Sequence, residues 1–428
     1  MNEEFLNQFG LRYNEKGILL LSGADLLDIS KEFGTPLYVF SKDLFKKNIN
    51  EFKIALNENF KNHFLLYASK ALSIKEIYRI LNVEGLGADV VSMGEILTAL
   101  SVGFNPSLLY FHGNSKSDED LTFAIEKGIK IVVDNESELN SIIRISKSIE
   151  KVSHILLRVK PGISPNTHSY IITGHLESKF GVSLEEGKNL LSIALKNRYI
   201  DFLGFHYHIG SQILDYDAFK KSAEEISLFL MGIKKELGYV PRELNVGGGF
   251  GIPYVPNDKR VDKKEFIRAI KDGLLTHIEN LDDFKILIEP GRALIGDTGL
   301  ILYRVLRKKF VNSKEYLFVD GGMGDNIRVP LYGARYTIAN VKRREGKIKN
   351  YHIFGKYCES GDIVAFDTPL EEVEEGDYIA VFPAIAYTYS MASNYNRFTR
   401  PPVVIVENGK GRLVVRRETY EQLMQNDI

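Results

Sequence analysis

The stretch Leu244-Asn-Val-Gly-Gly-Gly-Phe-Gly251 is a short apolar run that passes directly into a glycine-rich turn. Seven other short apolar runs also end in polar or glycine-rich clusters, and helical patterns lie between them. The eight runs are Phe64–Ala68, Ala88–Val91, Leu108–His112, Ile129–Val133, Ile155–Val159, Phe202–His208, Leu244–Val246 and Ile286–Ile288. Short buried strands that alternate with helices predict a (β/α)8 barrel, whose active site forms at the carboxyl ends of the strands.

The clusters that follow four of these runs contain residues that can bind a ligand or take part in a reaction. They are Ser69-Lys70, Ile209-Gly-Ser-Gln212, Gly247–Gly251 and Glu289-Pro-Gly-Arg292. Phosphate sites in such barrels favour the loops after strands seven and eight. Glycines let a ligand approach the backbone closely, so Gly247, Gly248 and Gly249 with Ser211 offer suitable donors for a phosphate.

Length and composition fit a cytoplasmic enzyme of two domains. The barrel pattern covers residues 40–290 of 428, which leaves enough chain for a second domain. The net charge is −1, from 55 basic and 56 acidic residues, so no electrostatic argument favours nucleic acid or an anionic membrane. A single cysteine excludes an intrachain disulfide framework, and no apolar stretch reaches the roughly 20 residues that span a bilayer. The amino terminus lacks the pattern of a signal peptide.

Several helices can be predicted from apolar spacing and end signals. Four apolar residues recur at three- and four-residue steps after Ser41: Phe45, Ile49, Phe52 and Leu56. Ser117 and Asp120 resemble a capping box, and a helical pattern over 217–237 ends at Gly238.

The two ends of the chain predict a second, all-β domain with a sandwich or barrel form. Short β-like runs lie at Tyr316–Val319, Tyr336–Val341, Tyr351–Phe354, Tyr378–Phe382 and Val403–Val406, and the last continues through a turn at Asn408–Gly411. Residues 11–21 predict a small hairpin, which is marginal alone in water. We therefore expect this arm to join the carboxy-terminal sheet, giving a discontinuous domain of residues 1–39 and 291–428.

The polar clusters together indicate a cofactor. Lys70, just past a buried strand, is expected in a partly dry site that favours the neutral amine able to condense with an aldehyde. Glu289 ends the eighth run and offers a carboxylate for a protonated ring nitrogen, and His208 could lie against a ring. A solvated Lys70 and a core His208 are the alternatives for each residue alone. An aldehyde-binding lysine, a phosphate cradle and this carboxylate together describe pyridoxal 5′-phosphate (PLP).

An ordered set of motifs then supports a family resemblance. The motifs are Gly34-Thr-Pro-Leu-Tyr-Val39, Tyr67-Ala-Ser-Lys-Ala71, Gly87–Glu95, Thr167–Gly174, Ser178-Lys-Phe-Gly181, His206-Tyr-His-Ile-Gly-Ser-Gln212, Gly247–Pro253, Glu289–Arg292, Cys358-Glu-Ser360, Ser390–Asn396 and Arg417-Glu-Thr-Tyr420. This set resembles the diaminopimelate decarboxylases, a branch of the fold-type III PLP-dependent decarboxylase family. The resemblance runs nearly from end to end. Leu72 and Ile385 depart from it, because the family often has asparagine and glycine at these positions.

The resemblance implies a role for each matching residue. For the cofactor, Lys70 matches the residue that binds the aldehyde, His208 the ring-stacking histidine, Glu289 the partner of the ring nitrogen, and Asp89 an acidic neighbour. Phosphate contacts match Ser211, Gly247, Gly248, Gly249, Gly291, Arg292 and Tyr387. Substrate contacts match Arg292, Arg328, Tyr332, Glu359 and Tyr387, and Cys358 matches the proton donor. No metal is implied.

The implied activity is decarboxylation of meso-2,6-diaminopimelate to L-lysine and carbon dioxide, the last step of lysine biosynthesis. The family also implies a homodimer in which the Cys358-Glu359 loop enters the partner's site. Two alternatives remain open. One is a decarboxylase for another diamino acid or a carboxylated polyamine, of the ornithine, arginine or carboxynorspermidine type. The other is a non-catalytic, PLP-binding regulator.

Overall fold

The computed structural model describes residues 3–162, 178–344 and 346–428. The chain divides into two compact units. The barrel unit contains Asn50–Ile252 and Arg260–Arg292, and the β unit contains Met1–Ile49, Pro253–Lys259 and Ala293–Ile428. Among the described residues, none of the helices has both the length and the apolar character needed to cross a membrane.

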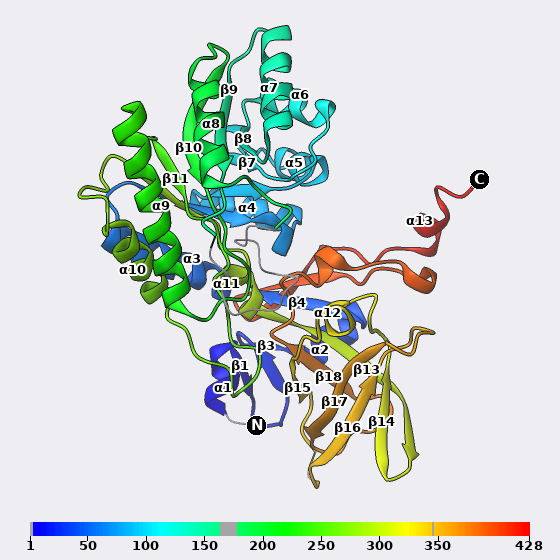
Figure 1. The fold of residues 1–428 in the computed structure, drawn as a ribbon. Coiled ribbons are helices and arrows are strands. Elements are labelled where there is room, and N and C mark those ends of the chain that lie inside the picture. Colours follow the sequence, from blue (N-terminus) through cyan, green and yellow to red (C-terminus); the bar gives the residue numbers. More distant parts are fainter. Residues whose placement is uncertain (1–2, 163–177, 345) are drawn as a thin grey trace. The chain divides into compact units, whose positions relative to one another are not determined.

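Parallel strands β5 to β12 close into a barrel in chain order, with β12 hydrogen-bonded to β5 (Figure 1). They are β5 (His63–Ala68), β6 (Gly87–Val90), β7 (Leu109–Phe111), β8 (Lys130–Val133), β9 (Ser153–Arg158), β10 (Ile200–His206), β11 (Glu243–Asn245) and β12 (Lys285–Ile288). Each predicted apolar run overlaps one of these strands, so the predicted barrel is confirmed.

Helices connect the barrel strands. They are α4 (Lys75–Glu84), α5 (Met93–Leu100), α6 (Asp118–Lys127), α7 (Glu136–Ser148), α8 (Leu184–Leu195), α9 (Tyr216–Leu237) and α10 (Lys263–Leu274). Helix α3 (Lys42–Asn59) precedes the first barrel strand in the chain. The capping box of Ser117 and Asp120 is present, and Gly238 ends α9 in a left-handed conformation, as predicted. The predicted stripe of α3 is fully buried.

The interior of the barrel is packed. Apolar side chains from several strands form its core, including Leu66, Leu156 and Leu287. Toward the amino ends of the strands, the hydroxyl of Tyr110 donates to Glu243 at 2.9 Å, and Lys130 contacts the Glu243 carboxylate at 3.1 Å. Because these groups fill the barrel, the polar residues at the carboxyl ends of the strands remain as the candidates for ligand binding.

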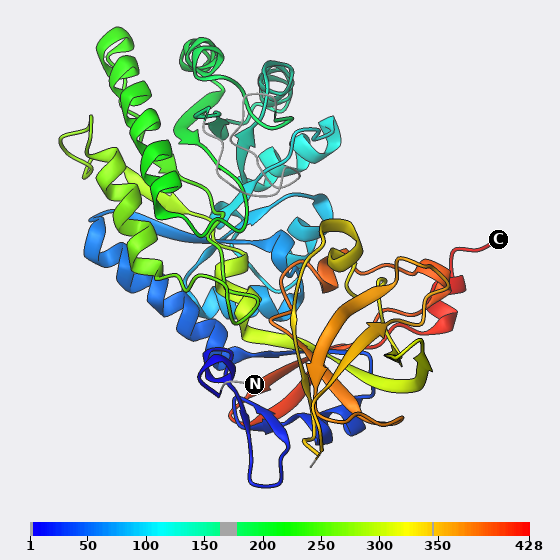
Figure 2. The ribbon, with the colours of Figure 1, turned by 60° about the horizontal axis from the view of Figure 1, so that its bottom comes forward.

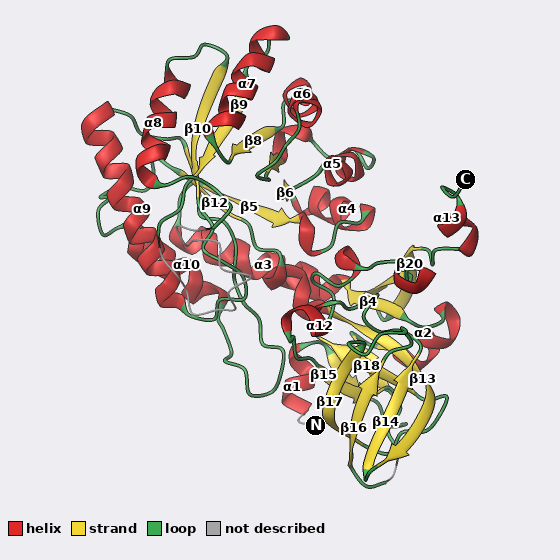
Figure 3. Cartoon of the chain, turned by 45° about the vertical axis from the view of Figure 1, so that its right-hand side comes forward, coloured by secondary structure: helices red, strands yellow, loops and turns green. Residues whose placement is uncertain are grey.

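The β unit is built on a mixed, nine-stranded sheet, in which β14, β16 and β17 lie side by side (Figure 3). Its strands are β4 (Leu37–Ser41), β13 (Gly299–Val311), β14 (Lys314–Val319), β15 (Thr337–Asn340), β16 (Lys349–Phe354), β17 (Ile363–Leu370), β18 (Tyr378–Phe382), β19 (Val403–Glu407) and β20 (Lys410–Val415). The predicted fold class, a parallel barrel with a separate domain made mostly of sheet, is confirmed. The long strand β13, which sequence reasoning did not identify, pairs with β4, β14 and β18.

The amino-terminal arm forms the predicted hairpin, but the hairpin does not become part of the large sheet (Figure 2, dark blue). Strands β1 (Leu11–Tyr13), β2 (Leu19–Leu21) and β3 (Ala24–Asp25) make a separate three-stranded sheet. The segment that does enter the large sheet is β4, between β13 and β19. The small sheet shares one hydrophobic core with the large one, and the Leu19 N–H donates to the Val341 carbonyl just past β15 at 2.8 Å, so packing and local backbone pairing together stabilise the hairpin.

Four further α-helices lie wholly within the described residues of the β unit. They are α1 (Glu3–Gln8), α2 (Leu26–Phe33), α12 (Arg328–Tyr332) and α13 (Tyr420–Met424). A short helix, α11 (Arg292–Ile295), begins at the last residue of the barrel unit.

Candidate active site

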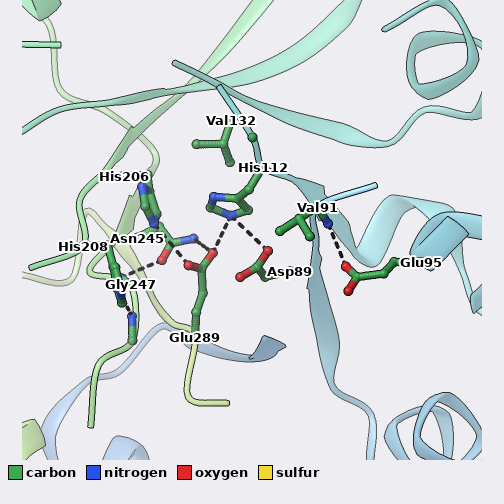
Figure 4. Close-up of polar contacts among 12 residues, drawn as sticks. Asp89, Val91, Glu95, His112, Val132, His206, His208, Asn245, Gly247 and Glu289 are labelled. Atoms are coloured by element: carbon green, nitrogen blue, oxygen red, sulfur yellow. Dashed lines mark hydrogen bonds and ion pairs between the residues drawn. The ribbon is translucent and has the colours of Figure 1, made fainter. Parts of the chain in front are cut away.

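Glu289 occupies the centre of a polar cluster at the carboxyl ends of the barrel strands (Figure 4). Its carboxylate is 5% exposed and lies directly after β12. His112 Nε2 lies 2.8 Å from Oε1, Asn245 donates Nδ2 to the same oxygen at 2.6 Å, and His206 Nε2 lies 3.1 Å from Oε2. The cluster therefore contains a buried carboxylate that contacts donors on both of its oxygens.

The surroundings of Glu289 favour its ionised form. Burial alone would raise the pKa of this carboxyl, but His112 and His206 hold it well below its usual range. Burial lowers the pKa of His206 to about 3, so this ring is neutral near pH 7. A neutral His206 that contacts Oε2 through Nε2 donates that N–H to the carboxylate.

Asp89 is the second acidic group of the cluster. It is the third residue of β6, is 3% exposed, and lies with Oδ1 3.9 Å from His112 Nε2. Burial raises its pKa above the ordinary value, although the charges of His112 and Lys70 act in the opposite direction. Asp89 therefore carries its negative charge less readily than Glu289.

Lys70 lies in a short 3-10 turn, η1 (Ser69–Ala71), that follows β5. The charge of Lys70 helps to lower the pKa of His208 and opposes the rise in the pKa of Asp89, so it acts on the same cluster. The side chain is exposed, so the prediction of a partly dry amine is wrong. Its two neighbours in the turn, Ser69 and Ala71, are buried, so the turn directs the Lys70 side chain alone outward. Leu72, the departure from the family pattern, is buried, and its carbonyl accepts from the Tyr67 hydroxyl at 3.2 Å.

The sequence predicts His208 on the sixth strand, and this position is wrong. His208 lies two residues beyond the end of β10. Its Nδ1 accepts a hydrogen bond from the Gly248 N–H at 3.1 Å. Desolvation, and then the charges of Lys70 and Arg158, lower the pKa of His208 well below its ordinary value. The ring is therefore neutral, carries its proton on Nε2, and is oriented by the glycine loop.

The glycine loop closely approaches the neighbouring turns. Gly247 has φ +70°, and a Cβ there would lie 2.4 Å from the carbonyl oxygen of Tyr207. Gly249 has φ +105°, and its Cβ would lie 2.4 Å from the carbonyl oxygen of Gly210. Any side chain at either position would separate this loop from the turn that contains Ser211.

Arg292 extends the same region. Its Nη2 donates to Oγ of Ser211 at 3.2 Å, and the residue is 4% exposed. Gly291, the preceding residue, packs against the end of β5, since a Cβ there would lie 3.0 Å from Cβ of Ala68. The predicted residues Ser211, Gly247–Gly249 and Gly291 thus lie in loops at the carboxyl ends of barrel strands, and Arg292 begins the short helix α11 that follows β12.

Three further predicted residues come together within the β unit. The guanidinium carbon of Arg328 lies 5.2 Å from the ring centroid of Tyr332 and 5.6 Å from that of Tyr387. Tyr387 has φ +60°, a left-handed conformation that is uncommon for tyrosine. Ile385, the other departure, is 1% exposed.

Cys358 and Glu359 lie in the loop between β16 and β17, and both are exposed. The Cys358 N–H donates to Oδ1 of Asn396 at 2.9 Å, and the Tyr395 hydroxyl lies 3.4 Å from Oε2 of Glu359. The Ser390–Asn396 motif therefore supports this loop. The predicted motif Thr167–Gly174 lies outside the described residues.

Sequence reasoning did not assign His112, His206 or Asn245 to the site. Each is the last residue of a barrel strand or the residue after it. A polar residue at that position of a buried strand is the signal that could have identified all three.

These residues fit PLP. Glu289 is an ionised, buried carboxylate suited to a cationic ring nitrogen, and Lys70 offers an amine at the same end of the barrel. The glycine loop, Ser211 and Arg292 provide backbone, hydroxyl and guanidinium donors for a phosphate.

Comparison with known proteins supports this reading of the site. Residues 46–296 match the family model described as pyridoxal-dependent decarboxylase, pyridoxal binding domain. The diaminopimelate decarboxylase of Bacillus subtilis (strain 168) is 43% identical over 424 residues, which cover 97% of each chain. This chain belongs to the diaminopimelate decarboxylases. It is therefore a PLP-dependent carboxy-lyase.

Other members of this family extend the agreement. The diaminopimelate decarboxylase of Aquifex aeolicus (strain VF5) is 35% identical, with 99% of each chain covered. A crystal structure of diaminopimelate decarboxylase from M. jannaschii in co-complex with L-lysine matches with a TM-score of 0.92 and 33% identity, and the match covers 98% of this chain and 97% of that one.

Proposed function

We propose that this protein decarboxylates meso-2,6-diaminopimelate to L-lysine and carbon dioxide in the cytoplasm. The observation that carries the proposal is the buried, ionised Glu289 at the same barrel end as Lys70 and His208. A PLP-binding regulator would use these groups as well, but it would not need a proton donor such as Cys358. Bound PLP supplies an electron sink for the electron pair left when the α-carboxylate departs.

The barrel domain, residues 40–290, provides most of the cofactor grip in this proposal. Lys70 binds the aldehyde through its amine, and His208 lies against the ring in the orientation fixed by Gly248. Glu289 keeps the ring nitrogen protonated, because a nearby negative charge favours the charged form. Asp89 pairs in register with Ala68, two residues before Lys70, and completes the polar surroundings.

The phosphate is held by loops and a hydroxyl. Gly247, Gly248 and Gly249 present backbone N–H groups, and Ser211 with Arg292 adds polar donors. Gly291 permits close packing beside Lys70. Tyr387 adds a hydroxyl from the second domain, residues 1–39 and 291–428.

The distal end of the substrate distinguishes diaminopimelate from ornithine. Arg328 and Arg292 grip the distal carboxylate, since a guanidinium can donate two parallel hydrogen bonds to one carboxylate. Tyr332 lies against Arg328 and keeps it oriented. Glu359 binds the distal ammonium. A substrate without the distal carboxylate would lose these charge-assisted hydrogen bonds, and this disfavours ornithine.

Cys358 donates the proton to the α-carbon after carbon dioxide leaves. We propose that it does so in the partner's site of a homodimer, which agrees with the exposure of Cys358 and Glu359 in the single chain. A thiol on a shaped loop can act as a general acid at one face of the α-carbon.

Carbon dioxide release from a panel of amino acids tests this function. Purified protein with added PLP should release carbon dioxide from meso-diaminopimelate far faster than from ornithine, arginine, lysine or carboxynorspermidine. Lys70→Ala protein is the matched control for contaminating activity. Preference for another diamino acid, or no release above the Lys70→Ala background, would contradict the proposal.

A further inference from the structure

Three side chains at the ends of different barrel strands contact the carboxylate of Glu289. Asn245 ends β11, His206 ends β10, and His112 follows β7. Asn245 and His112 contact Oε1, whereas His206 contacts Oε2. A carboxylate has about four acceptor positions. With three of them directed at these side chains, roughly one remains for a ligand.

We propose that Asn245 and His206 are positioning residues that hold the Glu289 carboxylate ionised and in one rotation toward the ring nitrogen of PLP. The inference rests on the proposed function, in which Glu289 binds that nitrogen. Each residue donates to a different oxygen, so the two together prevent rotation of the carboxylate about its terminal bond.

The orientation of the Asn245 amide is determined by its second contact. Its Oδ1 accepts from the Gly247 N–H at 3.0 Å, so Nδ2 is the group that faces Glu289. The Glu289 N–H in turn donates to the Gly247 carbonyl at 2.8 Å. These three residues form a closed set of hydrogen bonds. Asn245 thereby links the carboxylate for the ring nitrogen to the first glycine of the phosphate loop.

His206 contributes a donor without a positive charge. The ring is 1% exposed, and its neighbours include Glu289, His112 and Arg158. An imidazolium at this position would cancel the charge of Glu289, whereas a neutral N–H leaves the carboxylate able to stabilise a cationic ring nitrogen. Burial, which keeps His206 neutral, is thus part of the same arrangement.

The test compares two cofactor probes on the apoprotein. PLP and its analogue with carbon in place of the ring nitrogen share every group except the one that Glu289 binds. Equilibrium dialysis gives the two dissociation constants, and wild-type protein should prefer PLP. Asn245→Leu and His206→Leu should each lower that preference roughly tenfold, the size of one hydrogen bond to a charged group, with analogue binding nearly unchanged. His206→Gln, which retains an N–H donor, should restore most of the preference.

Two reference variants distinguish the outcomes. Tyr110→Phe removes a buried hydrogen bond at the other end of the barrel and should keep the full preference. If Glu289→Gln protein also keeps the full preference for PLP over the analogue, Glu289 does not bind the ring nitrogen. The proposed function then loses that contact. If Glu289→Gln loses the preference but both leucine variants keep it, the inference alone is wrong. If the leucine variants lose affinity equally for PLP and for the analogue, Asn245 and His206 have a merely structural role. That result would also overturn the inference. Should Asn245→Leu not fold, Asn245→Ser replaces it.

Discussion

The guanidinium of Arg328 lies over the ring of Tyr387, with its central carbon 5.6 Å from the ring centroid. Arg328 begins the short helix α12 and Tyr332 ends it. The ring centroid of Tyr332 lies 5.2 Å from the guanidinium carbon of Arg328. Two aromatic rings against one guanidinium restrict its orientation and leave its planar donors in a defined direction. A group that is held in this way is suited to a carboxylate.

Arg328→Lys should therefore weaken catalysis through the substrate and not through the cofactor. Lysine keeps the charge but loses the paired donors, and losing a hydrogen bond to a charged group costs about 1.5 to 3 kcal/mol. We expect kcat/KM for diaminopimelate to fall roughly tenfold to hundredfold, with PLP affinity unchanged. Arg307→Lys, on an exposed part of β13, is the matched control. Wild-type kcat/KM in Arg328→Lys protein would remove Arg328 from the substrate grip.

Lys70→Ala should abolish the covalent link to PLP and nearly all turnover, while the fold remains intact. Lys70 is exposed at the end of β5, so its replacement leaves no buried cavity. Borohydride reduction of PLP-loaded protein, followed by peptide mapping, identifies the modified lysine directly. Two other lysines of the barrel unit are informative alternatives. A pyridoxyl label on Lys160 or Lys179 would end the assignment, and Lys160→Ala protein should still be labelled on Lys70.

The stability of the apoprotein should fall in acid partly because of His206. Burial lowers the folded pKa of His206 to about 3, below the ordinary value of 6.5. Between these values the unfolded chain binds a proton that the folded chain does not, so stability is lost as the pH falls from about 6.5 toward about 3. The contribution is at most about 1.4 kcal/mol per pH unit.

Urea unfolding at several pH values measures this effect. His206→Gln protein cannot bind the proton, so its free energy of unfolding should decline less steeply than that of wild-type protein below pH 6.5. His208→Gln should behave in the same direction, since the pKa of His208 is also lowered. Parallel curves for wild-type and His206→Gln protein would show that His206 is already protonated in the folded chain.

Sequence patterns located the barrel because each of its strands is a short apolar run closed by a polar cluster. They did not reveal β13, whose second half reads Arg304-Val-Leu-Arg-Lys-Lys-Phe-Val311 and resembles an exposed segment. This strand is stabilised by distant partners, β4 and β18 among them, that no local pattern identifies.

The site was predictable in part for a related reason. Lys70, Glu289 and the glycine loop carry distinctive chemistry at strand ends, so the sequence alone indicated them. Asn245 and His206 are common residue types, and their meaning comes from the barrel register that places β11 beside β12. Only then does Asn245 lie within hydrogen-bonding distance of Glu289.

The last prediction concerns the exposed loop of Cys358. If this loop completes the partner's site in a twofold dimer, neither Lys70→Ala nor Cys358→Ala protein should be active alone. Mixing the two with free subunit exchange should give about half heterodimers, and each heterodimer carries one site with both residues intact. Activity should then recover to about a quarter of wild type by the same counting. Two Cys358→Ala preparations mixed under the same conditions are the control and should stay inactive. No recovery, despite subunit exchange demonstrated by mass spectrometry of differently tagged chains, would place Cys358 in its own chain's site or outside the mechanism.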